Sequence, residues 1–154
     1  MEYAEGRAGR VFVARMHEGE DIYACLEGLA REEGVKAAVC YLVGGIARGK
    51  VVVGPEEREP PLRPVFRQFD DARELVGVGT IFWNDAGPKL HLHAGIGRGD
   101  DPIVGCPRGG AEVFLVLEAV IMEILGVGAS RAVEPGLDLA LLHLTDAKTL
   151  KGKE

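Results

Sequence analysis

The first elements are predicted by a change in the spacing of apolar side chains. Residues Arg10 to Met16 read R-V-F-V-A-R-M, an alternating stretch that suits a strand packed on both sides along part of its length. The apolar positions then change to the i, i+3, i+4, i+7, i+8 spacing of one helix face: Ile22, Cys25, Leu26, Leu29 and Ala30. Asp21 and its acidic neighbours suit the positive end of this helix, and Gly34 is its expected stop.

Short apolar runs predict strands over most of the remaining chain. Ala37 to Gly45 and Ile46 to Val53 are two such runs, and the Gly44-Gly45 pair marks a bend or bulge between them. The charged, proline-rich segment Pro55 to Pro64 is an exposed connection and not a domain linker, because neither flank could form a domain alone. Val65 to Phe69 is expected to be a short strand.

A hairpin is predicted in the middle of the chain. Glu74 to Trp83 and Lys89 to Ile96 are β-rich runs, and Asn84 to Pro88 supplies turn-forming residues between them. A Gly/Asp loop follows at Gly97 to Pro102. No helix pattern follows its glycines, so a tight loop is favoured over a nucleotide-binding fingerprint.

Two further strands complete the predicted organisation. Ala111 to Leu125 is compatible with a strand or a helix, and its β-branched and aromatic residues favour a strand. Leu137 to Leu144 is predicted to be a terminal strand, and Lys148 to Glu154 a frayed tail. With 154 residues and no internal repeat, the chain is expected to form one domain over residues 1–154.

Composition and charge narrow the class of protein. Apolar residues make up 47%, but no window approaches the roughly 18 uninterrupted apolar residues of a membrane span, so we expect a soluble protein without a membrane partner. Met1 to Arg7 lacks the order of a secretory signal, which favours the cytoplasm. The formal charge of −6 argues against DNA binding, although an acidic protein can still carry a local basic patch.

The cysteines are expected to be reduced thiols. Cys25, Cys40 and Cys106 are odd in number and form no C-x-x-C pair, so neither a disulfide framework nor a zinc ribbon is indicated. Cys25 lies on the apolar helix face and Cys40 in an apolar strand. Both are therefore interpreted as core residues.

The candidate chemistry centres on His91 and His93. An H-x-H pair on a strand sets both imidazoles on one face, while the apolar residues around them take the other. Two nitrogen ligands are then aimed at one point, and Cys106 is the candidate third ligand of a zinc-type divalent metal. The alternative is that two polar side chains on a half-exposed strand are simply solvated.

Several short motifs lie at spacings shared with one known family. They are Gly19 to Ile22 (G-E-D-I), Gly44 to Ile46, Gly79 to Ile81 (G-x-I), Leu90 to Ala94 (L-H-L-H-A), Val104 to Cys106 (V-G-C), Gly110 and Glu118. Together they resemble the plants-and-prokaryotes-conserved (PPC) domain family over most of Arg10 to Leu144. The resemblance implies an α+β fold, a mainly antiparallel β-sheet with one principal α-helix packed on it, assembled as a homotrimer.

The resemblance also implies a choice of partners. In prokaryotic members the histidines can hold a metal, commonly zinc, near a subunit boundary; in plants the domain accompanies AT-hook motifs that bind A·T-rich minor groove. This chain has Cys106 where the family's third histidine would stand, and it has no AT-hook. Because a thiolate also suits zinc, a site of His91, His93 and Cys106 remains chemically sound. The alternative is a decayed site in which Cys106 is a small buried residue.

Four further residues near the proposed ligands have open roles. Glu118 is expensive to bury unpaired, so it is expected to face solvent, a cation, or a histidine for which it accepts a hydrogen bond. Arg98 and Arg108 could attract an anionic ligand or could be plain surface charge. Gly110 keeps the family's offset from Cys106.

Two functions follow from these observations. The first is a trimeric metal-binding module that binds a small ligand or has a regulatory role. Whether it is an enzyme stays open, because no general base or nucleophile pair is visible in the sequence. The second is a DNA-binding protein of the AT-hook-associated type. Gly6 to Arg10 is basic but lacks the R-G-R core flanked by proline, and with the net charge this disfavours the second function.

Overall fold

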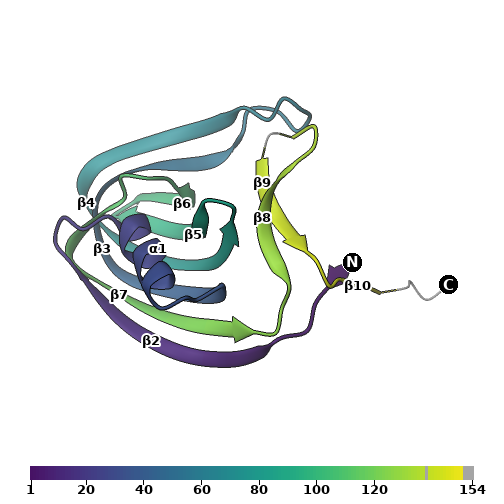
Figure 1. Ribbon diagram of the computed structural model, residues 1–154. Coiled ribbons are helices and arrows are strands. Elements are labelled where there is room, and N and C mark those ends of the chain that lie inside the picture. The colour runs from purple at the N-terminus through teal and green to yellow at the C-terminus, as the bar shows by residue number, and fades with distance from the viewer. Residues whose placement is uncertain (138, 151–154) are drawn as a thin grey trace.

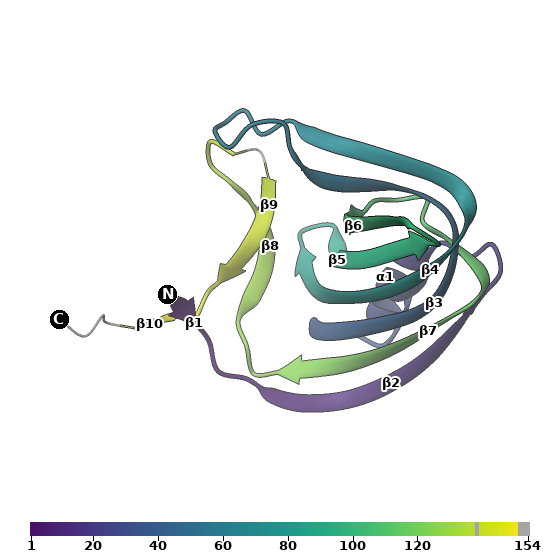
Figure 2. The ribbon, with the colours of Figure 1, turned by 180° about the vertical axis from the view of Figure 1, so that it is seen from behind.

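One antiparallel sheet organises the molecule, with strands in the order β2-β7-β3-β4-β5-β6 (Figures 1 and 2). The computed structural model describes residues 1–137 and 139–150. The sheet consists of β2 (Arg7–His17), β3 (Ala37–Pro55), β4 (Pro64–Asn84), β5 (Gly87–Arg98), β6 (Asp101–Pro107) and β7 (Glu112–Leu125). Two small pairs lie outside it: β1 (Glu2–Tyr3) with β10 (Lys148–Thr149), and β8 (Ala129–Glu134) with β9 (Leu139–Leu144).

The predicted helix and its stop are confirmed. Helix α1 (Ile22–Glu32) begins after Asp21, whose carboxylate accepts a hydrogen bond from the Ala24 N–H at 2.8 Å. The chain leaves it through Gly34 at a φ of 67°, which glycine adopts without strain. The buried side chains of the helix pack into the core beneath the sheet: Ile22, Leu26 and Ala30.

Two long strands replace four shorter predicted ones. β3 joins the two runs predicted on either side of the Gly44-Gly45 pair, and β4 joins those predicted at Val65 to Phe69 and Glu74 to Trp83. They stay continuous because they pair with each other along nearly their whole lengths. The connection between them is mostly exposed, as predicted.

The predicted bend is confirmed at Gly44, where the register of β3 with β7 shifts. A Cβ added at Gly44 would lie 2.4 Å from the Val116 carbonyl oxygen, and the φ of Gly44 is 147°. Only glycine permits this approach. The strand that the sequence favoured over Ala111 to Leu125 is β7, so that choice is also confirmed.

The sheet curls back on itself at β6. The loop expected over Gly97 to Pro102 is confirmed only at its centre, Gly99 and Asp100, because its outer residues pair as the ends of β5 and β6. Strand β6 was not predicted, and it also pairs with β3, where Val52 lies opposite Cys106. A Cβ at Gly105 would lie 2.2 Å from the Val52 carbonyl oxygen, so glycine allows the two strands to approach. Cys106 is thereby held beside β5.

The terminal hairpin was predicted only in part. β9 confirms the strand expected within Leu137 to Leu144, of which residue 138 lies outside the described residues, but its partner β8 was not predicted. The hairpin stands beside the turn end of β4 and β5 (Figures 1 and 2). Of the predicted tail, Lys148 and Thr149 pair with β1, and residues 151–154 lie outside the described residues.

The two faces of the sheet differ in burial. The face under α1 carries side chains that are at most 2% exposed: Leu42, Ile81, Leu92, Leu117 and Ile121. The opposite, outer face exposes valines, with Val13 81% and Val78 52% exposed. Within the described residues, no helix is long and apolar enough to cross a membrane.

Candidate metal centre

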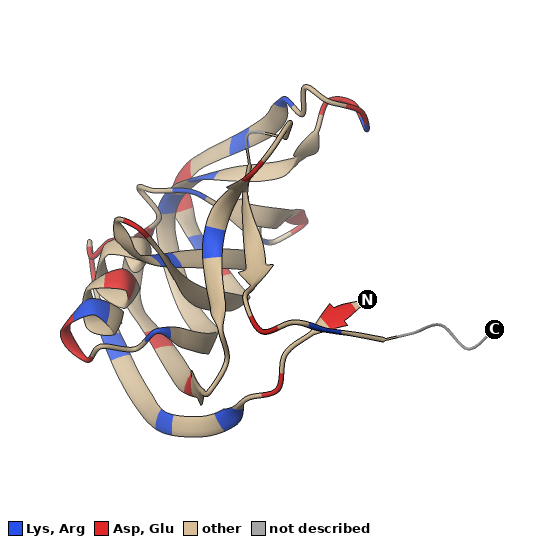
Figure 3. Ribbon diagram, turned by 45° about the vertical axis from the view of Figure 1, so that its right-hand side comes forward, with Lys and Arg blue, Asp and Glu red and all other residues tan. Residues whose placement is uncertain are grey.

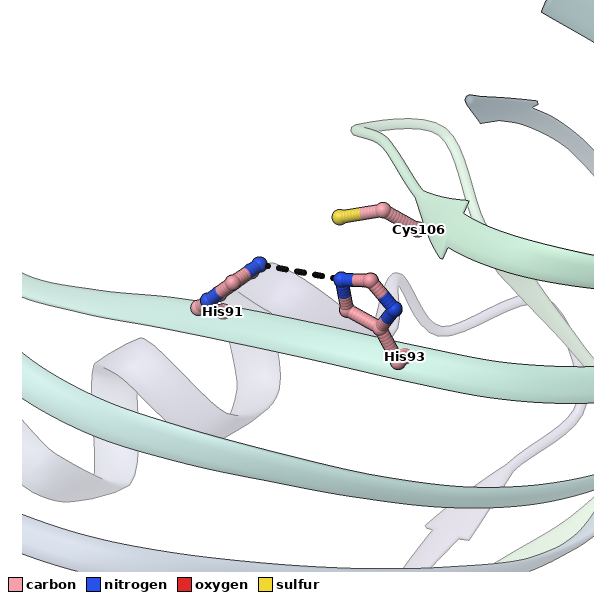
Figure 4. Close-up of side chains that lie close together, drawn as sticks. All are labelled: His91, His93 and Cys106. Atoms are coloured by element: carbon pink, nitrogen blue, oxygen red, sulfur yellow. Dashed lines mark hydrogen bonds between the residues drawn. The ribbon is translucent and has the colours of Figure 1, made fainter. Parts of the chain in front are cut away.

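Strand β5 places His91 and His93 on the outer face. His91 lies opposite Thr80 and His93 opposite Val78 on β4, and both histidines are exposed. Their rings meet edge to face, with centroids 5.0 Å apart and an interplanar angle of 78°. The two Nε2 atoms are 3.2 Å apart (Figure 4). The alternation of β5 therefore aims both imidazoles at one point.

Cys106 reaches the same point from β6. The β5–β6 hairpin sets Ala94 opposite Gly105, so the next residue, Cys106, follows alongside His93. Its side chain is 4% exposed, and the Sγ atom points over the two rings (Figure 4). One ligand atom from each of the three residues lies within 4.8 Å of the others. The structure thus brings together the three residues that the sequence analysis expected as metal ligands.

A tyrosine fixes the end of the strand that carries the cysteine. The Tyr23 hydroxyl on α1 donates a hydrogen bond to the carbonyl of Pro107, the residue after Cys106. Burial raises the pKa of Tyr23, so the hydroxyl stays a donor at neutral pH. The helix under the sheet thereby helps to position Cys106.

The donor atoms fit a zinc-type ion. Two nitrogen ligands with Zn–N distances of about 2.0–2.1 Å in tetrahedral arrangement lie about 3.3–3.4 Å apart. The observed Nε2–Nε2 separation of 3.2 Å matches this spacing, and the Cys106 sulfur lies within 4.8 Å of both histidines' donor atoms. Two imidazoles and a thiolate are also the donor types that zinc prefers.

The surroundings set the protonation of the ligands. Partial burial lowers the pKa of His91, and the nearby charges of Arg131, His93 and Arg108 lower it further, so its imidazole is neutral and able to coordinate. Burial raises the pKa of the Cys106 thiol, against a lowering by Arg108. A metal must therefore displace the thiol proton when it binds.

The other residues singled out in the sequence take different places. Arg108 is exposed just after β6, close enough to influence His91 and Cys106 through its charge. Arg98 lies at the end of β5 in an ion pair with Asp71 at 3.1 Å, away from the cluster.

Gly110 and Glu118 lie outside the cluster. The Gly110 N–H donates to the carboxylate of Asp21 at 2.9 Å, which ties the loop before β7 to the start of α1. Glu118 is exposed on β7, with Arg15 opposite on β2 and Val43 opposite on β3. Two strands, β3 and β4, therefore separate it from β5. The Glu118 side chain was expected to face solvent, a cation or a histidine, and in the structure it faces solvent.

One residue of the centre was missed. Arg131 on β8 extends its Nη2 to the Thr80 hydroxyl at 2.9 Å and to His91 Nδ1 at 3.3 Å. Its guanidinium lies 5.7 Å from the Phe82 ring centroid. The turn residues Pro135 and Gly136, between two short alternating runs, were the available signal for the hairpin that carries it.

The fold and the cluster define a small domain with one helix on an antiparallel sheet and a candidate His2Cys metal centre. The model of the Plants and Prokaryotes Conserved (PCC) domain matches residues 3–125, and the chain belongs to this family. The resemblance drawn from the sequence motifs is therefore confirmed. The matched range ends before β8, so Arg131 lies beyond it.

Solved structures share the fold at low identity. A metal-containing protein from Archaeoglobus fulgidus is 23% identical, with a TM-score of 0.81 over 92% of this chain and 98% of its own. A plant- and prokaryote-conserved (PPC) protein from Pyrococcus horikoshii is 22% identical, with a TM-score of 0.79 over 97% and 98%.

A third structure carries another description. A candidate DNA-binding protein from Ralstonia eutropha JMP134 is 19% identical, with a TM-score of 0.72 over 86% of this chain and 90% of its own. At these identities the likeness establishes the fold alone. No curated protein matches the chain.

Proposed function

We propose that residues 1–154 form a single PPC domain that binds a divalent metal, zinc above others, through His91, His93 and Cys106. The observation that supports this most directly is the 3.2 Å separation of the two Nε2 atoms, with Cys106 Sγ in reach of both. The Archaeoglobus fulgidus protein of the same fold is described as metal-containing. The proposal assigns a small-ligand-binding or regulatory role and no reaction.

Three protein ligands leave a further position on a zinc-type ion for water or another molecule. A metal held there would supply a Lewis acid at an exposed face of the sheet. Arg131 and Arg108 add positive charge beside it, which favours an anionic ligand. This is the physical basis for expecting a ligand-binding module.

The metal content of the purified protein tests the proposal. We expect about one zinc per chain in protein prepared without chelator, and loss of that zinc in His91→Ala and Cys106→Ala. The matched control is His17→Ala, which removes an exposed histidine on β2 and should keep the metal. Equal metal in all four proteins, or none in the wild type, would refute the metal site.

We further propose that the chain assembles as a homotrimer through the outer face of the sheet. The register aligns one apolar residue on each of four neighbouring strands, in a row that ends at His93: Val13, Val120, Tyr41 and Val78. Each of the four is at least 37% exposed. A monomer rarely leaves such a patch uncovered, and in a closed trimer a neighbouring copy of the chain is its expected cover.

Light scattering tests the assembly. Wild-type protein should have the mass of three chains, and Val13→Glu should shift it toward one chain while the metal stays bound, because Val13 lies at the far end of the row from His93. Glu57→Lys, which reverses an exposed charge in the connection between β3 and β4, is the control and should keep the mass of three chains. A wild type with the mass of one chain would refute the proposed homotrimer.

A second candidate is a DNA-binding role without an AT-hook. It is favoured by the description of the Ralstonia eutropha protein of the same fold. It is opposed by the net charge of −6 and by the mixture of acidic and basic residues along the ribbon (Figure 3). DNA affinity measured across salt concentrations separates the two, because contacts to phosphates give a steep fall with salt. A flat or absent response would eliminate this candidate.

A further inference from the structure

The hydrogen bonds of Arg131 leave its side chain incompletely satisfied. Nη2 donates to the Thr80 hydroxyl at 2.9 Å and faces His91 Nδ1 at 3.3 Å. The Nε atom is buried and has no hydrogen-bond partner among the described residues. A buried donor without an acceptor costs free energy, so the guanidinium has capacity for a further acceptor.

The contact with His91 depends on which ring nitrogen carries the proton. Arg131 can donate to Nδ1 only while Nδ1 is unprotonated, which leaves the proton on Nε2. If Nε2 instead gives its lone pair to a metal, the neutral imidazole carries its proton on Nδ1. Two donors, Nη2 and Nδ1–H, then face each other at 3.3 Å, and an acceptor oxygen between them would resolve the conflict.

We propose that metal binding at His91, His93 and Cys106 turns Arg131 and His91 into a paired donor site for the carboxylate of a small organic acid. This rests on the proposed metal site. Metal-bound histidines usually donate the other ring N–H to a carboxylate, a carbonyl or water. Among the hydrogen bonds of residues 1–137 and 139–150, the only partner of His91 Nδ1 is Arg131, so the acceptor must come from outside the described chain.

A cavity beside Arg131 has room for the rest of such a molecule. It has a volume of about 870 Å³ and lies between the β8–β9 hairpin and the end of β4. Its walls combine the apolar surfaces of Trp83, Ala132 and Val133 with the cations of Arg131 and Lys36, against one carboxylate, Asp85. This volume and mixture are typical of sites for small ligands.

The apolar walls favour an acid with a flat, apolar body over a bare anion. The Trp83 indole is held in place because its Nε1–H donates to the Val35 carbonyl at 2.7 Å. The Lys36 ammonium lies 3.2 Å from the centroid of the Trp83 ring. The ammonium covers this face of the indole, so an aromatic carboxylate with its charge at Arg131 places its own ring against Ala132 and Val133.

Calorimetric titration with benzoate tests the inference on zinc-loaded protein. We expect binding to the wild type, and a loss of affinity of roughly 10- to 100-fold in Arg131→Gln, as for removal of a charged hydrogen bond. Metal-free wild type should lose a similar factor. Arg98→Gln, an arginine change at the far end of β5, is the matched control and should bind as the wild type does.

A second variant protects the test against misfolding of Arg131→Gln. Thr80→Val removes the hydroxyl that orients Arg131 while keeping a β-branched residue on β4, and should weaken benzoate roughly 2- to 10-fold. Zinc content is measured for every variant and should not change.

The outcomes separate this inference from the metal site itself. Zinc bound at full occupancy with equal benzoate affinity in the wild type, Arg131→Gln and Thr80→Val would overturn the anion site alone. No zinc in the wild type would overturn both. Tighter binding of inorganic phosphate or acetate than of benzoate would overturn the assignment to an acid with an apolar body.

Discussion

Successive residues of strand β5 point to opposite faces of the sheet, one of which is buried and the other exposed. Leu90, Leu92 and Ala94 point under the sheet and are 7%, 0% and 3% exposed. His91 and His93, between them, point outward and are exposed. One strand therefore supplies the core with apolar area and the outer face with two proposed metal ligands, so its packing and its proposed chemistry depend on different residues.

This division explains why the candidate site can be rigid while it remains open to solvent. The inner face anchors the backbone of β5, helped by Glu27 of α1, whose carboxylate accepts a hydrogen bond from the Leu90 N–H at 3.0 Å. The anchored backbone fixes the positions from which the two histidines project, and the contacts of His91 with His93 and Arg131 orient its ring. A ligand or a second subunit can cover them without rebuilding the core.

The largest expected effect comes from truncating a side chain on the inner face of β5, compared with the same truncation on the outer face. Leu92→Ala should lower the free energy of unfolding of the metal-free protein by about 2–5 kcal/mol, because it opens a cavity in a fully buried site. His93→Ala should change the same quantity by no more than about 0.5 kcal/mol. Urea unfolding in chelator measures both, and a His93→Ala loss as large as that of Leu92→Ala would contradict the division.

Metal removal should lower the stability of the wild type only through the histidines of the outer face. At a free zinc concentration a thousandfold above Kd, binding to the native state adds about 4 kcal/mol to its stability. A chelator should therefore lower the melting temperature of the wild type and leave that of His93→Ala unchanged. A chelator effect of equal size in His93→Ala would place the stabilising metal elsewhere.

The hydrogen bond between Tyr23 of α1 and Pro107 connects the inner face of the sheet with the proposed metal ligands, and removing it tests whether the two depend on each other. Tyr23→Phe removes the hydroxyl that donates to the Pro107 carbonyl and should lower the free energy of unfolding by about 1 kcal/mol. Because Cys106 precedes Pro107, zinc affinity should also fall, whereas Tyr41→Phe on the outer face should leave it unchanged. Unaltered affinity in Tyr23→Phe would show that the metal ligands do not depend on the helix.

The smallest effect concerns a charge at the edge of the inner face. Glu123 pairs with Arg10 at 2.9 Å, and this hydrogen bond lowers the pKa of the Glu123 carboxyl below its ordinary value of 4.5. The pair therefore stabilises the protein above about pH 4.5, and the contribution is lost as the pH falls through the lowered pKa. The stability difference between wild type and Glu123→Gln should shrink from pH 7 to pH 3, and a constant difference would contradict this.

The sequence predicted correctly those features that depend on the spacing of neighbouring residues. The alternation around His91 assigned its face correctly, the spacing from Ile22 gave the helix, and Gly44 marked the bend. The V-G-C motif was matched to the position of Cys106 by family resemblance, since no spacing rule connects residues on different strands.

Properties that depend on strand register could not be read from the sequence. Glu118 kept the family's offset, yet the sheet order places β3 and β4 between β7 and the histidines. Arg131 reaches His91 through a hairpin whose docking depends on tertiary contacts with β4. β3 and β4 merged from shorter predicted strands because each supplies the other's hydrogen bonds across the interruption.

All three proposed ligands lie within one hairpin, residues 91–106, which closes through the turn at Gly99 and Asp100. Hairpins of this kind form in microseconds, far sooner than contacts between distant parts of a chain. An ion captured by the hairpin would favour its native register before β2 and β7 have joined the sheet. Zinc should therefore accelerate refolding of the wild type in stopped-flow experiments and should not accelerate that of His93→Ala. The bound metal would then help to start folding as well as stabilise the folded protein.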